Sequence, residues 1–387
     1  IYEHGKPVAT DHYFKWSAAG AKNGELTFVA GNPGSTDRLL TVAELLRERD
    51  MAMPRSLLRL AEARGFLNEY RRRGAEADRM ALEDLFRVEN ALKRAKGNHK
   101  ALVGKELFAA KLAAEKELRA RILANPEWQK KYGGAWDVIA TAIADYEAMY
   151  DDLRYIEHGG GFDSQLWHWA KTLVRAADEL PKKNDKRLPE YRDSALPAVQ
   201  QRLLAKRPFS AEYEIATLSY SLTKLREDLG PDHPSVKKVL GKESPDELAA
   251  RLVKGSKLSD ATLRQKLWEG GKQAHTTVAG DPMIQLVKAI DPLARAVRKR
   301  YEDTIESVWN RNDERVAQAR FAVWGVSTYP DATFTFRISF GAVKGWTEPG
   351  GKQVKPFATL AGAFARHTGA DPFALPKSWL DHKSKLD

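Results

Sequence analysis

The chain has 387 residues, 43% of them hydrophobic, and a formal net charge of +11 at pH 7. This hydrophobic content can fill about two or three globular cores, which excludes a disordered chain. No apolar run approaches the roughly 20 residues that cross a bilayer, and the lack of cysteine excludes disulfides, thiolate metal sites and cysteine nucleophiles.

The first forty residues have the pattern of short strands separated by turns. Aromatic and β-branched side chains are frequent at 13–16 and 26–30, and Gly31-Asn32-Pro33-Gly34 combines residues that favour a tight turn. A β element is therefore predicted to open the chain, and we assign residues 1–40 to a partial β domain.

Helical periodicity begins at Thr41, where apolar residues start to recur at helical spacing. Pro54 is predicted to end or kink a helix because proline lacks a backbone N–H. Shorter helices are predicted after Ser244, whose hydroxyl can cap a helix that begins with Pro245, and after Ser259. Long helices are predicted at about 76–97, 103–124, 134–157, 163–178, 197–206, 210–228 and 283–320.

Alternation of large apolar and smaller residues returns from Thr333 to Phe340 and is followed by a turn at Pro349-Gly350-Gly351, which together indicate a hairpin. The order predicts a mainly α protein with flanking β structure. An irregular all-helical domain at 41–320 is inserted into a β domain that residues 321–387 continue. Two β fragments of this size would form a poor sheet by themselves, so we expect further strands outside this chain.

The positive charge raises an alternative function, a basic helical module that binds nucleic acid or another anionic polymer. The distribution of charge argues against it, since the run Arg71-Arg72-Arg73 has Glu69 and Asp78 nearby, as on a solvated helix face. A contiguous positive face in the structure would favour this alternative, and a patchwork of mixed charge would not.

Residues able to form a complete active site are not evident in the pattern. Ser35 lies in a Gly-rich segment, but no G-x-S-x-G motif surrounds it, and the segment is explained by a tight turn. The nine histidines are scattered without metal-binding spacing, so we predict no metal and no cofactor. Trp167-His168-Trp169 is expected to be partly buried in a helical core, and Gly159-Gly160-Gly161 to link two helices.

Asn90 is the one polar residue for which a binding role is considered. The apolar stripe of its predicted helix comprises Leu82, Leu85, Phe86 and Leu92, which leaves Asn90 on the flank, one turn after Phe86. Its amide oxygen could accept a hydrogen bond from a ligand ammonium and does not titrate. Asparagine on a helix surface is nevertheless more often inert.

Several segments, taken in order, resemble the bacterial dipeptidyl aminopeptidases of the dipeptidyl-peptidase 7 and 11 type. The resemblance spans essentially the whole chain, and the order and spacing of the segments make chance agreement improbable. The segments that carry it are GNPGSTDRLLT (31–41), VENALKRAKG (88–97), LPEYRDSAL (188–196), LGKESPDELAARLV (240–253), DPMI (281–284), RYEDTIES (300–307), ARFAVWGVSTYPDATFTFRISFGAVKGW (319–346) and PFALPKSWL (372–380).

This resemblance implies a serine exopeptidase that releases dipeptides from free peptide N-termini. Its fold would be a trypsin-like double β-barrel interrupted by a helical cap domain, without a cofactor. The His-Asp-Ser triad of such enzymes matches no position here, so we expect this chain to be a fragment without catalytic residues that is inactive alone. Ile1, which is not an initiator methionine, led to the same expectation.

The resemblance also implies a role for Asn90, which matches an asparagine that helps to hold the substrate's N-terminal ammonium. Peptides with a free N-terminus are therefore the predicted partners, and no nucleic acid and no transmembrane segment are expected. A periplasmic, outer-membrane-associated or secreted location is implied, and the family pattern would allow a homodimer.

Overall fold

The computed structural model describes residues 2–3, 5–274, 276–327, 330–348, 350–370 and 373–385. It divides into a helical unit, Leu40–Tyr329, and a β unit formed by Ile1–Leu39 with Pro330–Asp387. The chain is mostly helical, as the sequence predicted, and the helical unit lies between the two segments of the β unit in sequence.

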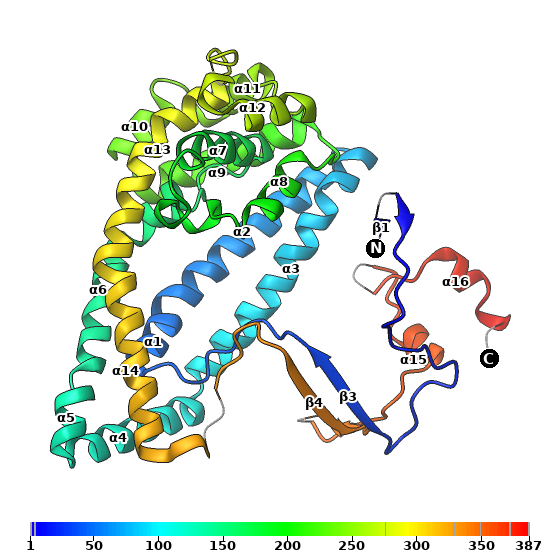
Figure 1. The fold of residues 1–387 in the computed structure, drawn as a ribbon. Coiled ribbons are helices and arrows are strands. Elements are labelled where there is room, and N and C mark those ends of the chain that lie inside the picture. The colour runs from blue at the N-terminus through cyan, green and yellow to red at the C-terminus, as the bar shows by residue number, and fades with distance from the viewer. Residues whose placement is uncertain are drawn as a thin grey trace. The chain divides into compact units, whose positions relative to one another are not determined.

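The helical unit contains fourteen α-helices in its described residues, with π-helical turns after α1, α6 and α13 (Figure 1). They are α1 (Val42–Arg47), α2 (Met53–Arg71), α3 (Ala75–Val103), α4 (Lys105–Leu123), α5 (Pro126–Tyr132), α6 (Ala135–Asp152), α7 (Gln165–Glu179), α8 (Leu196–Leu204), α9 (Ala211–Leu229), α10 (Pro234–Leu240), α11 (Pro245–Gly255), α12 (Ala261–Ala274), α13 (Pro282–Tyr301) and α14 (Ser307–Trp324).

Side-chain caps explain where several helices begin. Thr41 caps α1 in a capping box with Glu44, and Ser244 caps α11 in the same way with Glu247. Pro245 occupies the first turn of α11, as predicted from the sequence. Pro54 likewise lies in the first turn of α2, but the backbone stays helical from α1 through the π-helical turn Glu48–Ala52, so no helix ends at Pro54.

Helices α2 and α3 form a long antiparallel hairpin that packs along its length (Figure 1). Leu60 of α2 packs with Leu92 of α3 in one cluster, and Leu67 packs with Leu85 in another. Tyr213 of α9 joins the second cluster and donates a hydrogen bond from its hydroxyl to Asp84. The hairpin is thereby attached to the rest of the helical unit.

The largest core lies where α7, α9, α11 and α13 meet. Leu166, Leu218, Leu222 and Ile284 are each fully buried there. Removing each such side chain from water contributes about 1.5–3 kcal/mol. A second core joins α4 and α6 to α14. The largest core fixes α7, around which the cavities of the helical unit are arranged.

The β unit consists of three two-stranded antiparallel ribbons among its described residues, with two short helices, α15 (Leu360–Ala365) and α16 (Lys377–Asp381). The strands are β1 (Tyr2–Glu3) with β2 (Lys6–Pro7), β3 (Leu26–Gly31) with β4 (Arg337–Ala342), and β5 (Trp346–Thr347) with β6 (Gln353–Val354). The central ribbon thus pairs residues more than 300 positions apart.

The strand predictions need correction at three places. Residues 13–16 are irregular rather than a strand, and Trp16 is 95% exposed because no strand pairs with it. Strand β4 begins at Arg337 and not at Thr333, since Phe334 has a left-handed φ of 63°. Helix α14 continues past the predicted boundary at residue 320, because Val323 and Trp324 pack against the second core.

The predicted hairpin near residue 350 corresponds to β5 and β6, although Pro349 of its turn lies outside the described residues. Residues 333–340, which were expected to form part of a hairpin, supply β4 and pair with β3 instead. Within the described part of the chain, no helix has the length and apolar character needed to span a membrane.

Candidate functional site

Four cavities of the helical unit adjoin one another around the start of α7. The α7–α8 cavity has a volume of about 600 Å³, and three more, of about 580, 610 and 320 Å³, lie along α2, α3 and α9. His168 lines three of the four, and Asp163 also lines three. Cavities of this size accommodate small organic ligands.

The loop before α7 places Asp163 at this junction. Gly161 lies close against α9, since a Cβ there would lie only 3.0 Å from the Leu225 side chain, tighter than most Cβ contacts. The backbone N–H of Asp163 donates to the Ser221 hydroxyl at 2.8 Å. The three glycines therefore connect the π-helical turn Leu153–Glu157 to α7, as a linker, and hold the loop against α9.

The start of α7 is also held by a carboxylate from α9. Ser164 caps the helix and donates its hydroxyl hydrogen to Glu214 at 2.6 Å, and the Gln165 N–H donates to the same oxygen at 2.9 Å. Burial raises the pKa of Glu214, although these hydrogen bonds oppose that effect. The neighbouring Asp163 carboxylate faces the cavities, where burial raises its pKa and Arg87 opposes the rise.

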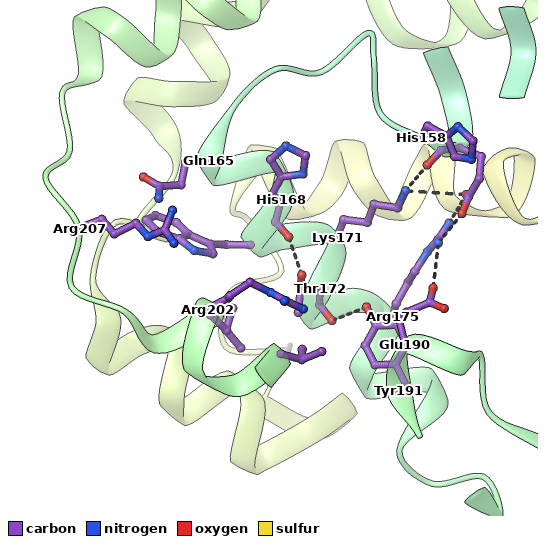
Figure 2. A pocket seen from close by; sticks show the side chains of 14 residues that line it. His158, Gln165, His168, Lys171, Thr172, Arg175, Glu190, Tyr191, Arg202 and Arg207 are labelled. Carbon is purple, nitrogen blue, oxygen red and sulfur yellow. Dashed lines mark hydrogen bonds and ion pairs between the residues drawn. The ribbon is translucent and has the colours of Figure 1, made fainter. Parts of the chain in front are cut away.

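The Trp167-His168-Trp169 segment is divided between core and cavity. Trp167 is buried and stacks on Phe162 with ring centroids 3.9 Å apart, while the buried Trp169 lies under the Arg264 guanidinium at 3.7 Å. His168 points into the cavities (Figure 2). Desolvation by the surrounding protein lowers the pKa of His168, and the positive charge of Lys171 lowers it further. The ring is therefore predominantly neutral at pH 7.

A buried ionic network behind the α7–α8 cavity was not predicted from the sequence. Arg175 of α7 forms two hydrogen bonds with Glu157, at 2.8 and 2.5 Å, and one with Asp291 of α13 at 2.6 Å. Arg298 continues the network to Glu190 at 2.6 Å. The pairs Asp291–Arg295 and Arg298–Glu302 have a helical i,i+4 spacing that the sequence could reveal, whereas the pairs between elements do not.

Asn90 lies on the exposed side of α3, beside the wall of the cavities. Arg87, Val88 and Ala91 of the same helix line the cavity between α2, α3 and α9, whereas Asn90 lies next to this face. Its side-chain amide makes no hydrogen bond within the described residues, so it is available to a ligand. Its contact with a substrate ammonium stays a prediction.

Phe86 was predicted to belong to the buried stripe of this helix, and the structure corrects this. Its side chain is 64% exposed, while Leu85 and Leu92 are buried. Phe86 and Asn90 are separated by four residues and therefore lie on the same face of α3. An exposed aromatic ring next to an unpaired amide is a suitable surface for an amphipathic ligand.

Ser35 belongs to the β unit, and the tight turn predicted for its segment is wrong, because residues 32–36 continue along residues 332–334 in extended form. It forms a bridge with Thr333, and its neighbour Thr36 donates a hydrogen bond to Asp331 at 2.6 Å. Backbone N–H groups of Arg38 and Leu39 also donate to Asp331. Among the described residues no histidine is hydrogen-bonded to Ser35, and none of the His, Asp and Glu side chains form a group of three that could hold a metal ion.

Comparison with known proteins identifies relatives over the full chain. A family model described as Peptidase S46 matches residues 2–387. The Asp/Glu-specific dipeptidyl-peptidase of Shewanella putrefaciens (strain CN-32) is 25% identical over 389 residues, which cover 98% of this chain and 52% of that protein. Dipeptidyl-peptidase 7 of Porphyromonas endodontalis is 22% identical over 377 residues, covering 94% and 44%. The chain spans about half the length of these curated relatives.

Solved structures show the same fold. Crystal structures of Porphyromonas endodontalis DPP11 in complex with the dipeptides Arg-Asp and Arg-Glu match with TM-scores of 0.67 and 0.64, at 18% and 17% identity. The matches cover 97% of this chain and 53% and 54% of those chains.

Proposed function

Because this chain belongs to the peptidase S46 family, we propose that it forms the helical domain and part of the β-barrel of a serine dipeptidyl aminopeptidase. In this proposal the natural protein removes dipeptides from free peptide N-termini, and the helical unit is inserted into a trypsin-like double β-barrel. The observation that carries the proposal is the family match over the whole chain, with curated relatives that are named dipeptidyl-peptidases.

Asn90 is proposed to hold the N-terminal ammonium of the substrate. Three features of α3 support this role: the exposed position of Asn90, its unpaired amide, and the exposed Phe86 ring on the same face. The packed α2–α3 hairpin fixes the backbone that carries Asn90 before substrate binds. A neutral amide favours an ammonium because an N-terminus blocked by an acyl group keeps only one N–H donor and loses the positive charge that strengthens the hydrogen bond to the amide oxygen.

The test is Asn90→Ala in the full natural protein, assayed with fluorogenic dipeptidyl substrates. We expect kcat/KM to fall roughly 5- to 150-fold, which corresponds to about 1–3 kcal/mol for a hydrogen bond to a charged group. Asn98→Ala is the matched control, since Asn98 is an exposed asparagine on the same helix. N-acetylated substrates should not be cleaved. An unchanged kcat/KM for Asn90→Ala would remove Asn90 from the site.

The same assay tests whether these 387 residues are sufficient for catalysis. We propose that they are not, because the resemblance places no member of the serine triad among them. The chain alone should give no hydrolysis above background, while the full natural protein does. Hydrolysis by the chain alone that serine-directed reagents abolish would contradict this proposal.

The alternative of an anionic-polymer module is disfavoured by how the charges are arranged. Arginines along several helices are paired with carboxylates, including Arg64 with Glu89 and Arg121 with Glu117. Such pairing gives mixed charge on those faces. A periplasmic, outer-membrane-associated or secreted location and a homodimer remain predictions that follow from the resemblance.

A further inference from the structure

The α7–α8 cavity is lined by more cationic than anionic side chains. It is bordered by α7, by the turn Pro189–Tyr191, by α8 and by the residues that follow α8 (Figure 2). Four permanently or potentially cationic groups line it, Lys171, Arg175, Arg202 and Arg207, against two carboxylates, Glu157 and Glu190. The two histidines of the lining, His158 and His168, both have lowered pKa values and add little charge at pH 7.

Both carboxylates are already engaged by other arginines. Glu157 accepts two hydrogen bonds from Arg175, and Glu190 accepts hydrogen bonds from Arg298 at 2.6 and 3.2 Å. Arg202 and Arg207, by contrast, form no hydrogen bond or ion pair with any described residue. Their charges therefore face the cavity without an anionic partner.

A third arginine, Arg264, holds the backbone between these two arginines. Arg264 of α12 is fully buried and donates hydrogen bonds to the carbonyl oxygens of Leu203 at 2.6 Å and Ala205 at 3.2 Å. Its guanidinium also stacks on Trp169, another lining residue. These bonds fix the backbone at Leu203 and Ala205, between the two arginines, which lowers part of the entropic cost of ordering them around a ligand.

The remaining lining is partly apolar, beside the polar groups of Gln165, Thr172 and Tyr191. Trp169, Val199 and Leu203 all line the cavity, and its volume of about 600 Å³ greatly exceeds that of one inorganic oxyanion. The combination of free guanidinium groups with an apolar wall is suited to a molecule that has both an anionic and an apolar part. Guanidinium binds carboxylate and phosphate oxygens in pairs, because its donors have the matching planar geometry.

We propose that the α7–α8 cavity binds a small organic anion, whose carboxylate or phosphate group pairs with Arg202 and Arg207 and whose apolar part contacts Trp169 and Leu203. Asn90 does not line this cavity. The site is therefore additional to the amine contact proposed above, and it does not depend on the peptidase function.

Lys171 provides an independent readout of binding. Burial, followed by the charge of Arg175, lowers the pKa of Lys171 to about 8. A bound anion favours the ammonium form, so binding near pH 8 should take up protons, and affinity should fall as the pH rises above 8. The other charged or titratable groups that act on Lys171 or lie beside it are Glu157, His158, His168, Arg175, Glu190, Asp291 and Arg298.

The experiment is isothermal titration calorimetry of the full natural protein with 3-phenylpropanoate, its uncharged analogue 3-phenylpropanamide, and inorganic phosphate. We expect the carboxylate to bind at least tenfold more tightly than the amide. Arg202→Gln and Arg207→Gln should each weaken binding at least tenfold. Arg226→Gln is the matched control, because Arg226 is an exposed arginine outside the cavity, and it should leave binding unchanged.

The outcomes distinguish binding of an organic anion from binding of an inorganic anion and from binding that does not depend on charge. Proton uptake at pH 8, measured in buffers of different ionisation enthalpy, would support it, and Lys171→Met should abolish that uptake. Equal affinity for the carboxylate and the amide, or binding that Arg202→Gln and Arg207→Gln do not change, would overturn it. Binding of phosphate without binding of 3-phenylpropanoate would replace the organic anion by an inorganic one, and no binding at 10 mM of any probe would also overturn the proposal.

Discussion

Glu179 at the end of α7 is a carboxylate with no solvent exposure that is nevertheless ionised. Burial opposes its ionisation, but hydrogen bonds from Lys182 at 2.8 Å, Arg295 at 2.7 Å and the Leu188 N–H at 3.0 Å outweigh this effect. Together they lower the pKa of Glu179 to about 2. The residue joins α7 to α13 and to the loop before residue 190.

Because the folded-state pKa of Glu179 lies below its unfolded value of about 4.3, the carboxylate stabilises the fold fully above pH 4.3. This contribution is lost as the pH falls towards 2. Glu179→Gln should therefore lower the free energy of unfolding by on the order of 2 kcal/mol at pH 7, and the difference from wild type should shrink between pH 5 and pH 2. Urea unfolding, monitored by tryptophan fluorescence at each pH, measures the free-energy difference at pH 7 and its decrease towards pH 2.

A control variant, Glu69→Gln, removes a carboxylate from an exposed pair with Arg72. Its unfolding free energy should stay within about 1 kcal/mol of wild type at every pH. A gap between Glu179→Gln and wild type that is the same at pH 7 and pH 2.5 would contradict the assigned role.

Single residues also show where sequence reasoning stops. Asn90 could be singled out only because a family pattern marked it, since an exposed asparagine has no pattern of its own. Arg175, Glu157 and Asp291 could not be connected, because their partners lie on helices far apart in sequence. Likewise, the sequence pattern does not distinguish Arg202 and Arg207 from other surface arginines. Only the fold shows that both line one cavity.

At the scale of elements, the close contact between the glycine loop and α9 allows a stability prediction. Gly161→Ala would place its Cβ 3.0 Å from Leu225 Cδ1 and 3.1 Å from Leu225 Cβ, and Leu225 is fully buried. The crowding should lower the free energy of unfolding by about 1–3 kcal/mol. Chemical denaturation of the purified variant measures the loss.

Gly65→Ala, in the interior of α2, is the control for this substitution. A Cβ at Gly65 would meet nothing within 4 Å, so alanine should stabilise the helix by about 0.5–1 kcal/mol. Opposite signs for the two glycine-to-alanine changes are expected. Equal stabilisation by the two changes would show that Leu225 moves aside and that the contact at Gly161 does not limit the size of the side chain there.

Elements whose boundaries depend on neighbouring residues could be predicted from the sequence. Elements that depend on residues far away in the sequence could not. Helix α11 could be placed from Ser244 and Pro245, because a capping residue and a proline act on the backbone next to them. The strand pairing of β3 with β4 could not, since its partners are separated by the whole helical unit. Residues 13–16 have strand-forming composition, but composition alone provides no partner strand.

At the scale of the whole molecule, the two units differ in how far their apolar side chains are buried. The helical unit buries its leucines and isoleucines in continuous clusters. In the β unit, Phe28 of β3 and both Ile338 and Phe340 of β4 lie on one side of the ribbon and are 65%, 60% and 76% exposed, and Val29 on the other side is 69% exposed. A two-stranded ribbon exposed on both faces is marginally stable in water.

Hydrogen exchange should therefore divide the 387-residue chain into two parts. Backbone amides of α7 and α9, which are packed in the main core, should be protected for hours, whereas those of β3 and β4 should exchange at least a hundredfold faster. Under the proposed function, further barrel strands cover the ribbon in the natural protein. The β3 and β4 amides should then exchange at least tenfold more slowly in that protein than in the chain alone, while those of α7 change little. Equal exchange of the ribbon in the two proteins would show that it is not part of a larger barrel, and the helical unit would have to be assigned to another β scaffold.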